Sequence, residues 1–345
     1  MRVSTTYVKC LLTRFEATGL NSNELLISSG INEKQLFSDR WIRIEKMIAL
    51  WKKAVEKSLD PHFGVHVGEH LCLNALGIVG SIMQVSQTLE TSLSKMIEFN
   101  ELTCELFEYT KVHLTKSVAL IRISVLPAIF DRQTERHLIS AEIASLISFM
   151  RGLTGKKIIP EEVTFTFPSL NEYEAKNFEC PIKYNSTENS LKISFEYLRL
   201  RLPGEDTDLR EFLEQNAKKL LNESSTAEKY TEKSRRLLLR SLHDGRINSI
   251  ELLAEKLNLS VRTLQRKLKD ENTTYNTLLE EVIYSSALRH LETSTELTIS
   301  EISYLLGYSD PCIFSRFFKR KSGFSPEDFR VRQNENLLEE PYVFG

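Results

Sequence analysis

The clearest pattern of apolar and polar positions lies in the last fifty residues of the printed sequence. Thr298 and Glu301 form a capping box, a pattern that predicts the start of a helix. Gly307 predicts the end of that helix, because glycine readily adopts a left-handed conformation. Asp310 and Pro311 predict the start of a second helix, since aspartate caps helices and the missing N–H of proline costs nothing in the first turn.

The second of these predicted helices has two different faces. Three phenylalanines recur on one face at helical spacing: Phe314, Phe317 and Phe318. Small polar and basic side chains occupy most of the remainder: Cys312, Ser315, Arg316, Lys319 and Arg320. Two helices around a glycine turn, the second with a basic face, are typical of a helix-turn-helix, whose second helix enters the major groove of DNA. The alternative is an ordinary helical hairpin with a solvated basic face.

A second copy of this pattern occurs about fifty residues earlier. Asn248 and Glu251 have capping-box spacing, and Asn258 takes the turn position, where asparagine tolerates a left-handed conformation. Ser260 predicts the cap of a helix over residues 261–269. Polar and basic side chains are expected to face outward from that helix: Arg262, Gln265, Arg266 and Lys269. Arginine pairs with guanine and glutamine with adenine through two hydrogen bonds each, so this face suits base edges.

Residues 275–291, between the two copies, predict one amphipathic helix. Such a helix would fix the two units relative to each other. Their second helices could then enter successive major grooves, which lie about 34 Å apart on one face of the duplex. The sequence therefore predicts an all-α domain with two helix-turn-helix units joined by a linking helix.

Residues 250–330 resemble the DNA-binding domain of the AraC/XylS family of bacterial transcription regulators. Two specific motifs carry the resemblance, in family order and at family separation: LSVRTLQRKLK and GYSDPCIFSRFFKRKSGFSPEDFR. The resemblance implies that bases are read by Arg262, Gln265, Arg266, Cys312, Ile313 and Arg316. It also implies phosphate contacts from Ser309, Ser315, Lys319 and Lys321.

Two positions depart from the pattern of this family. Asn258 stands where glycine is usual in the first turn, and Ser303 stands where the second unit usually has alanine. Neither change is expected to prevent folding. A buried Ser303 hydroxyl would need a backbone partner.

The first 221 residues predict an α+β domain. Apolar periodicity and end signals predict helices over 7–17, 24–28, 40–58 (capped by Asp39), 63–71, 88–102, 134–151 and 209–221. Alternating apolar and polar residues predict strands over 111–126, 163–167 and 191–197. The expected fold class is therefore a set of helices with a small antiparallel sheet, followed by the all-α domain.

This N-terminal half resembles the corresponding domain of AraC-family regulators of the ornithine-utilisation and virulence-regulator type. The segments that carry the resemblance are LDPHFGVHVGEH, ALGIVGSIMQVSQTLETSLSKMIEFNEL and FECPIKYNSTENSLKISFEY. The resemblance implies a regulatory domain that senses a small molecule or dimerises. It does not imply the sugar-binding cupin barrel of the arabinose regulator, because the all-β pattern of that barrel is absent.

Composition and charge suggest the domain boundaries. The short polar stretch 222–228 is the expected linker between a regulatory domain (1–221) and a DNA-binding domain (229–333), and residues 334–345 form an acidic tail. Residues 228–332 hold 18 Lys and Arg against 15 Asp and Glu, whereas the whole chain has a net charge of −2. Because this basic excess is modest, we expect base contacts and dimerisation to supplement phosphate attraction.

Other segments bear on location and chemistry. The five cysteines, an odd number without CxxC spacing, suit a reducing cytoplasm, and no signal peptide is visible. Residues 70–89 lack Asp, Glu, Lys and Arg, but their polar side chains would be costly in a bilayer, so we expect protein interior.

Three histidines form a candidate metal site. His62, His66 and His70 recur every four residues, which would place three imidazoles on one helix face for zinc or nickel. Gly64 and Gly68 weaken such a helix, and no fourth ligand is evident. We therefore interpret them as solvent-facing or packing histidines and expect no metal.

The sequence as a whole predicts a cytoplasmic, sequence-specific transcription regulator, expected to act as an activator. Its expected partners are double-stranded promoter DNA, RNA polymerase, a small-molecule effector and a second copy of the chain, without a membrane or a cofactor. GxGxxG, HExxH and GxSxG patterns are absent, so no enzyme is expected. Two alternatives stay open for the N-terminal half: a ligand-free oligomerisation scaffold, or an enzyme fused to the DNA-binding module.

Overall fold

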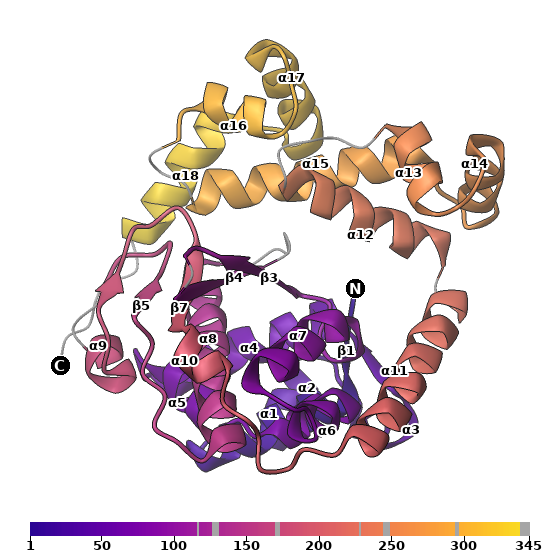
Figure 1. Cartoon of the computed structure of the whole chain (residues 1–345). Coiled ribbons are helices and arrows are strands. Elements are labelled where there is room, and N and C mark those ends of the chain that lie inside the picture. Colours follow the sequence, from indigo (N-terminus) through magenta and orange to yellow (C-terminus); the bar gives the residue numbers. More distant parts are fainter. Residues whose placement is uncertain are drawn as a thin grey trace. The chain divides into compact units, whose positions relative to one another are not determined.

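The protein forms two compact units. The computed structural model describes residues 1–115, 117–125, 131–169, 173–227, 229–243, 249–293 and 297–338. Unit 1 contains the described residues of 1–125 and 133–226, and unit 2 contains residues 131 and 132 and the described residues from 227 onward. Figure 1 shows the elements of both units.

Unit 1 combines helices with two sheets. Its helices are α1 (Thr5–Ala17), α2 (Ser22–Ser28), α3 (Glu33–Ser38), α4 (Ile44–Ser58), α5 (Phe63–Glu69), η1 (Leu73–Leu76), α6 (Ile78–Gln84), α7 (Leu89–Glu98), η2 (Asn100–Leu102), α8 (Arg132–Thr154), α9 (Tyr173–Phe178), α10 (Phe195–Leu198) and α11 (Thr207–Ala227). Its strands are β1 (Arg2–Ser4), β2 (Trp41–Arg43), β3 (Phe107–His113), β4 (Val118–Val125), β5 (Glu162–Thr164), β6 (Ile182–Lys183) and β7 (Asn189–Ser194). This confirms the α+β class.

The main sheet is mixed rather than purely antiparallel. Its strand order is β3-β4-β7-β5-β6, and β5 pairs with β6 in parallel, whereas the other pairs are antiparallel. The two-stranded sheet of β1 and β2 is antiparallel, which confirms the predicted small antiparallel sheet. Strand β6 has two residues, too few for alternation to predict it from sequence.

Two predicted strands are divided in the structure. The range 111–126 contains a turn, in which the backbone N–H groups of Leu114 and Thr115 donate to the carbonyl oxygen of Val118; residue 126 lies outside the described residues. Strands β3 and β4 therefore form a hairpin around this turn. The range 191–197 changes from strand to helix at Ser194, whose hydroxyl accepts from the N–H of Glu196 and caps α10.

The predicted helix over 40–58 begins later than expected. Residues 41–43 form β2, which pairs with β1 near the start of the chain, and α4 begins at Ile44. Asp39 instead follows α3 as its C-cap. Pairing between segments about forty residues apart leaves no local pattern in the sequence, so this strand could not be predicted from residues 40–58 alone.

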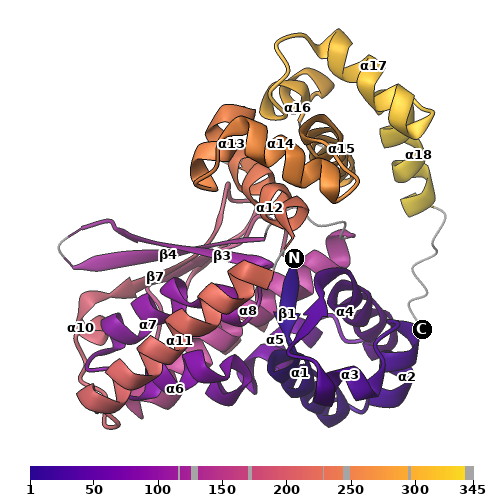
Figure 2. The same ribbon diagram turned by 90° about the vertical axis from the view of Figure 1, so that its right-hand side faces the viewer.

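Helix α8 forms the centre of unit 1. On one side it packs against α5, where the N–H of Gly64 donates to Nδ1 of His137 at 3.1 Å. On another side the Tyr109 hydroxyl of β3 donates to Glu142 at 2.5 Å. Helices α7 and α8 lie on the same face of the main sheet (Figure 2). Lys111 of β3 pairs with Glu90 of α7 at 3.0 Å, which supports this placement.

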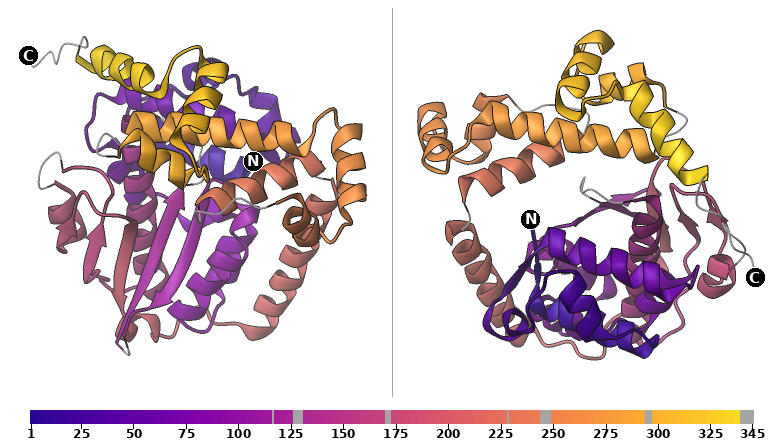
Figure 3. Two further views of the ribbon diagram at one scale, coloured as in Figure 1. Left: turned by 90° about the horizontal axis from the view of Figure 1, so that it is seen from above. Right: turned by 180° about the vertical axis from the view of Figure 1, so that it is seen from behind.

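Unit 2 is helical in its described residues. It consists of α12 (Tyr230–His243), α13 (Ile250–Lys256), α14 (Val261–Asp270), α15 (Tyr275–Thr293), α16 (Ile299–Leu305), α17 (Pro311–Ser322) and α18 (Pro326–Leu338). Helix α15 runs between the pair α13–α14 and the pair α16–α17 (Figure 3). The predicted linking helix is therefore confirmed. Helix α11 includes residues 222–227 of the expected linker, and α18 includes residues 334–338 of the expected tail; residues 228 and 339–345 lie outside the described part.

The contact between α5 and α8 requires glycine. A Cβ atom added to Gly64 would lie 2.1 Å from the carbonyl oxygen of His137, and one added to Gly68 would lie 2.1 Å from that of Ala141. We expect Gly64→Ala to lower the free energy of unfolding of unit 1 by about 2 kcal/mol or more. The added methyl group would clash with the His137 carbonyl oxygen, which belongs to the backbone of α8 and cannot move aside easily. Urea unfolding followed by circular dichroism measures this change.

Gly152→Ala is the matched control. Gly152 also lies in a helix of unit 1, but an added Cβ would meet no atom within 4 Å. We expect this variant to unfold at equal or slightly higher urea concentration, since alanine favours a helix by up to about 1 kcal/mol. Equal free energies of unfolding for Gly64→Ala and Gly152→Ala would contradict the close contact between α5 and α8.

Candidate nucleic-acid interface

The first helix-turn-helix consists of α13 and α14. Ser249 caps α13, because its hydroxyl accepts from the N–H of Leu252. This corrects the capping box expected from Asn248, which lies outside the described residues, and Glu251. Asn258 has a φ of 54° and thus takes the predicted left-handed turn. Ser260 caps α14 as predicted, accepting from the N–H of Thr263.

The second helix-turn-helix consists of α16 and α17. Thr298 and Glu301 form the predicted capping box, and Gly307 has a φ of 81°. Asp310 caps α17, with Pro311 in the first turn, so these signals are confirmed. The phenylalanines of α17 are buried against three aromatic rings: Phe314 and Phe317 contact Tyr308 of the turn, and Phe318 contacts Tyr284 of α15 and Phe329 of α18.

The predicted base-reading side chains all lie on the surface of the two second helices. Exposed side chains are Arg262, Gln265 and Arg266 on α14, and Cys312, Ile313 and Arg316 on α17. The core side of each helix is apolar, so the outer side is available to a ligand. Ile313 is 46% exposed, an apolar side chain among polar ones, and the methyl group of thymine suits such a contact.

The predicted phosphate-contact residues differ in their surroundings. Ser309, Lys319 and Lys321 are exposed, and Ser315 is half-buried. Lys321 pairs with Glu280 of α15 at 2.7 Å, and Arg320 pairs with the same carboxylate at 2.9 Å.

The ion pairs with Glu280 affect which basic side chains are available to contact a phosphate. The hydrogen bond from Lys321 holds the pKa of Glu280 below its usual value. Lys319 forms no such ion pair within the described residues, so its ammonium group need not leave a carboxylate to reach a phosphate.

Helix α15 contacts α12 and the second helix-turn-helix through neighbouring side chains. Glu281 pairs with Arg235 of α12 at 2.7 Å, while Glu280 pairs with α17. Leu278, Val282 and Ile283 are buried on the same helix. Helix α15 thus joins α17 to α12.

A further carboxylate joins α14 to α12. Glu271, just after α14, accepts hydrogen bonds from the N–H groups of Tyr230 and Thr231 at 2.9 and 2.7 Å. Burial would raise the pKa of Glu271, but these hydrogen bonds outweigh burial and lower it. Because the first turn of a helix has free N–H groups, this contact caps α12 from outside.

The histidines at 62, 66 and 70 do not form a group in the structure. His62 is buried, with Nδ1 at 4.0 Å from Glu174, and burial lowers its pKa. His66 instead contacts Asp60, with 2.6 Å between Nδ1 and the carboxylate, and His70 ends α5. The residues that the structure describes contain no cluster of three or more His, Cys, Asp or Glu able to hold a metal. Gly64 and Gly68 belong to the α5–α8 contact.

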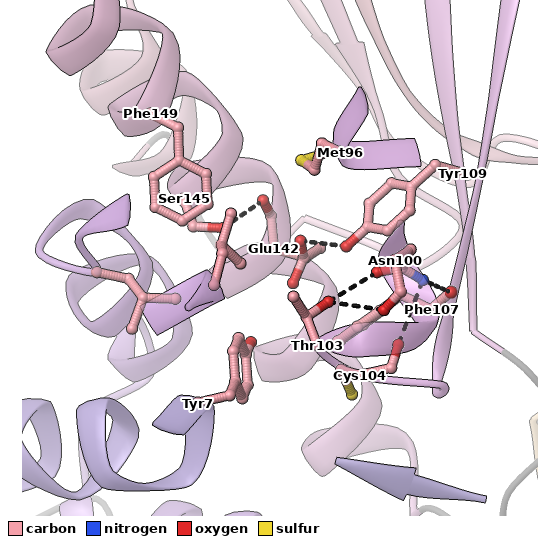
Figure 4. Close-up of a pocket in the computed structure, with 12 residues that line it drawn as sticks. Tyr7, Met96, Asn100, Thr103, Cys104, Phe107, Tyr109, Glu142, Ser145 and Phe149 are labelled. Atoms are coloured by element: carbon pink, nitrogen blue, oxygen red, sulfur yellow. Dashed lines mark hydrogen bonds between the residues drawn. The ribbon is translucent and has the colours of Figure 1, made fainter. Parts of the chain in front are cut away.

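Unit 1 contains a small internal cavity that the sequence analysis did not identify. Figure 4 shows polar side chains from four parts of the chain around it: Tyr7, Asn100, Thr103, Tyr109, Glu142 and Ser145. Burial raises the pKa of Glu142 to about 7, against the opposite effect of the hydrogen bond from Tyr109. A lone glutamate within the apolar run 138–150 was the signal that could have indicated it.

Two helix-turn-helix units with exposed basic and polar faces define a DNA-binding protein, and comparisons with known proteins give its family. Residues 19–202 match the family model of the arabinose-binding N-terminal domain of AraC transcription regulators, and residues 253–332 match a helix-turn-helix family. The chain belongs to the AraC family of transcription regulators. Unit 1 combines helices with a mixed sheet, so the expectation that it is not an all-β barrel is confirmed.

Individual relatives have related names. The ornithine utilization regulator of Pseudomonas aeruginosa is 27% identical over 276 residues, 79% of each chain. The transcriptional activator RhaS of Escherichia coli is 29% identical over 193 residues, which are 53% of this chain and 64% of RhaS. The crystal structure of the regulator CdpR from P. aeruginosa aligns over 90% of this chain and 96% of its own, with 20% identity and a TM-score of 0.47.

Within the described residues, no helix has the length and apolar character needed to cross a bilayer.

The Ser303 hydroxyl has a different environment from the expected one. Ser303 is fully buried, and within the described residues its Oγ has no hydrogen-bond partner, so the expected backbone partner is absent. An unpaired buried hydroxyl costs about 1–3 kcal/mol. We therefore expect Ser303→Ala to raise the free energy of unfolding of unit 2 by about 1 kcal/mol, as measured by urea unfolding.

Ser300→Ala provides the control, because Ser300 lies exposed in the same helix. Both substitutions gain the same helix propensity, so the difference between them isolates the buried hydroxyl. A Ser303→Ala variant less stable than Ser300→Ala would show that the hydroxyl has a partner.

Proposed function

We propose that the two helix-turn-helix units read one promoter site together. Arg262, Gln265 and Arg266 would contact bases in one major groove, and Cys312, Ile313 and Arg316 would contact bases in the next. The observation that carries this proposal is the exposure of all six side chains on α14 and α17, which are joined through α12 and α15. Arginine and glutamine supply hydrogen bonds to purines, and isoleucine supplies an apolar contact.

The phosphate contacts are proposed for Ser309, Ser315, Lys319 and Lys321. Phosphate contacts set the position on the duplex and give most of the salt dependence, without reading the sequence. Lys321 would have to exchange Glu280 for a phosphate, whereas Lys319 would not. Lys319 is therefore the better site for measuring a phosphate contact.

The N-terminal unit is the proposed regulatory part. We assign residues 1–221 to a regulatory domain, 222–228 to a linker and 229–333 to the DNA-binding domain, with an acidic tail after them. A small-molecule effector or dimerisation would shift the population toward an arrangement that binds DNA. One relative is named an activator and another a regulator of ornithine utilization, which supports control of a metabolic gene.

At the promoter, the bound protein would act as a cytoplasmic activator that recruits RNA polymerase. It would need no catalytic chemistry of its own. The alternative of a ligand-free oligomerisation scaffold is less well supported, because unit 1 contains a cavity lined by polar groups.

Genome-wide mapping of bound DNA, followed by titration of the recovered site, tests DNA reading directly. We expect tighter binding to the recovered site than to random duplex of the same length. Equal affinity for both would overturn the proposed function.

Arg316→Ala tests base reading by α17. We expect this variant to lose about 1–3 kcal/mol of binding free energy on the wild-type site and to relax preference at one base pair, because an arginine that reads a base acts at its own position. Binding to a panel of single-base variants measures both effects. Lys34→Ala, an exposed residue of unit 1, is the control with the same charge change. A uniform loss on every DNA would contradict base reading.

Lys319→Ala tests a phosphate contact. We expect weaker binding to all sequences by a similar factor, since a phosphate carries no sequence information. The slope of log K against log salt concentration should fall in magnitude by about 1. Fluorescence anisotropy over a range of salt concentrations measures this slope, again with Lys34→Ala as the control. An unchanged slope would remove Lys319 from the phosphate-contact set.

A further inference from the structure

The cavity of unit 1 contains a buried carboxyl group with no basic side chain beside it. Glu142 of α8 is 6% exposed, and no lysine, arginine or histidine is among the residues that line the cavity. A carboxylate buried without a positive partner destabilises a protein by several kcal/mol. Such a group, in a cavity, is a candidate ligand-binding group.

Three hydroxyl groups around this cavity already donate hydrogen bonds within the protein. The hydroxyl of Tyr109 lies 2.5 Å from Glu142, that of Thr103 donates to Asn100, and that of Ser145 donates to the Glu142 carbonyl oxygen. The side-chain amide of Asn100 donates to the carbonyl oxygens of Cys104 and Phe107. What these hydroxyl groups can still offer a ligand is their oxygen lone pairs. These hydroxyl oxygens and the Glu142 carboxylate line the cavity with hydrogen-bond acceptors.

A cavity lined by hydrogen-bond acceptors and one carboxylate favours a ligand with hydrogen-bond donors and a positive charge. An ammonium group has three donors, a positive charge and no acceptor, so it meets both requirements. The Glu142 carboxylate would repel an anion, and a neutral alcohol would leave the charge of Glu142 unpaired. The cavity has space for about one water-sized group, which is the size of an ammonium head.

The remaining wall is apolar. It contains Leu71, Leu76, Met96 and Phe149. The rings of Tyr7 and Tyr109 also line the cavity and can attract a cation through their faces (Figure 4). With the proposed role of unit 1 as an effector domain as its basis, we propose that this cavity binds the ammonium group of a small primary amine, with Glu142 as its counter-ion.

The charge of Glu142 makes binding depend on pH. Its pKa of about 7 means that the carboxylate forms between pH 6 and pH 8, while an alkylamine stays protonated. The other titratable groups that face Glu142 are Tyr7 of α1, Tyr109 of β3 and Cys104. Burial raises the pKa of all three, so they stay neutral over this range. Amine binding should therefore strengthen as pH rises from 6 to 8.

Calorimetric titration of the full chain tests this site. The probes are ammonium and methylammonium at pH 8, with methanol as the neutral counterpart of methylammonium. We expect both cations to bind in the millimolar range, as their few atoms allow, and the alcohol not to bind. Binding of an alcohol as tight as that of its amine would overturn the proposal.

Two variants and the pH profile complete the test. Glu142→Gln keeps the shape of the side chain and should weaken amine binding by roughly a hundredfold or more, because the ammonium group would lose its counter-ion. Glu108→Gln, on β3 but outside the cavity lining, should bind as the wild type does. If Glu142→Gln does not fold, the wild-type pH profile decides: binding equally strong at pH 6 and pH 8 would overturn the proposal.

DNA binding by the same samples separates this inference from the proposed function. A protein that binds its promoter site but no amine would overturn the cavity assignment alone. A protein that binds amines through Glu142 but distinguishes no promoter from random duplex supports the cavity assignment and overturns DNA reading.

Discussion

The DNA-binding unit depends on one helix, α15, that holds two others in place. Its neighbouring glutamates pair with different partners, Glu281 with Arg235 of α12 and Glu280 with Arg320 and Lys321 of α17. Exposed ion pairs contribute about 0–1 kcal/mol each, so they cannot supply most of the stability. Burial of Leu278, Val282, Ile283 and Ala287 supplies more, since burying a large aliphatic side chain contributes about 1.5–3 kcal/mol. The apolar face therefore fixes α15 in the unit, and the ion pairs help to set the angle of the helices around it.

The sequence predicted the C-terminal unit almost completely because its signals are local. Capping residues, left-handed turn positions and phenylalanines at helical spacing all act within a few residues, and Asp310, Gly307 and Asn258 have the expected roles. The first cap was misassigned, because Asn248 and Ser249 are both good capping residues and only the structure distinguishes them. The six side chains predicted to contact bases are all exposed on α14 and α17.

The N-terminal unit was harder to predict because its pairings are distant. Strand β2 depends on β1 about forty residues away, and the parallel β5–β6 pair joins residues about twenty apart. The cavity escaped prediction for the same reason: Tyr7, Tyr109 and Glu142 come from three elements that only the tertiary fold brings together. Gly64 and Gly68 were interpreted as helix-weakening residues, whereas their lack of a side chain is what lets α5 approach α8.

That close approach has a mechanical consequence. The α8 carbonyl oxygens that contact Gly64 and Gly68 precede Glu142 by one to five residues in the same helix. Because the two backbones are in contact, α5 and α8 cannot slide along each other. Sliding would force a neighbouring side chain into the narrow space beside Gly64 and Gly68. A displacement of α8 near Glu142 would therefore move α5 as well, because the two helices would shift together as one rigid body.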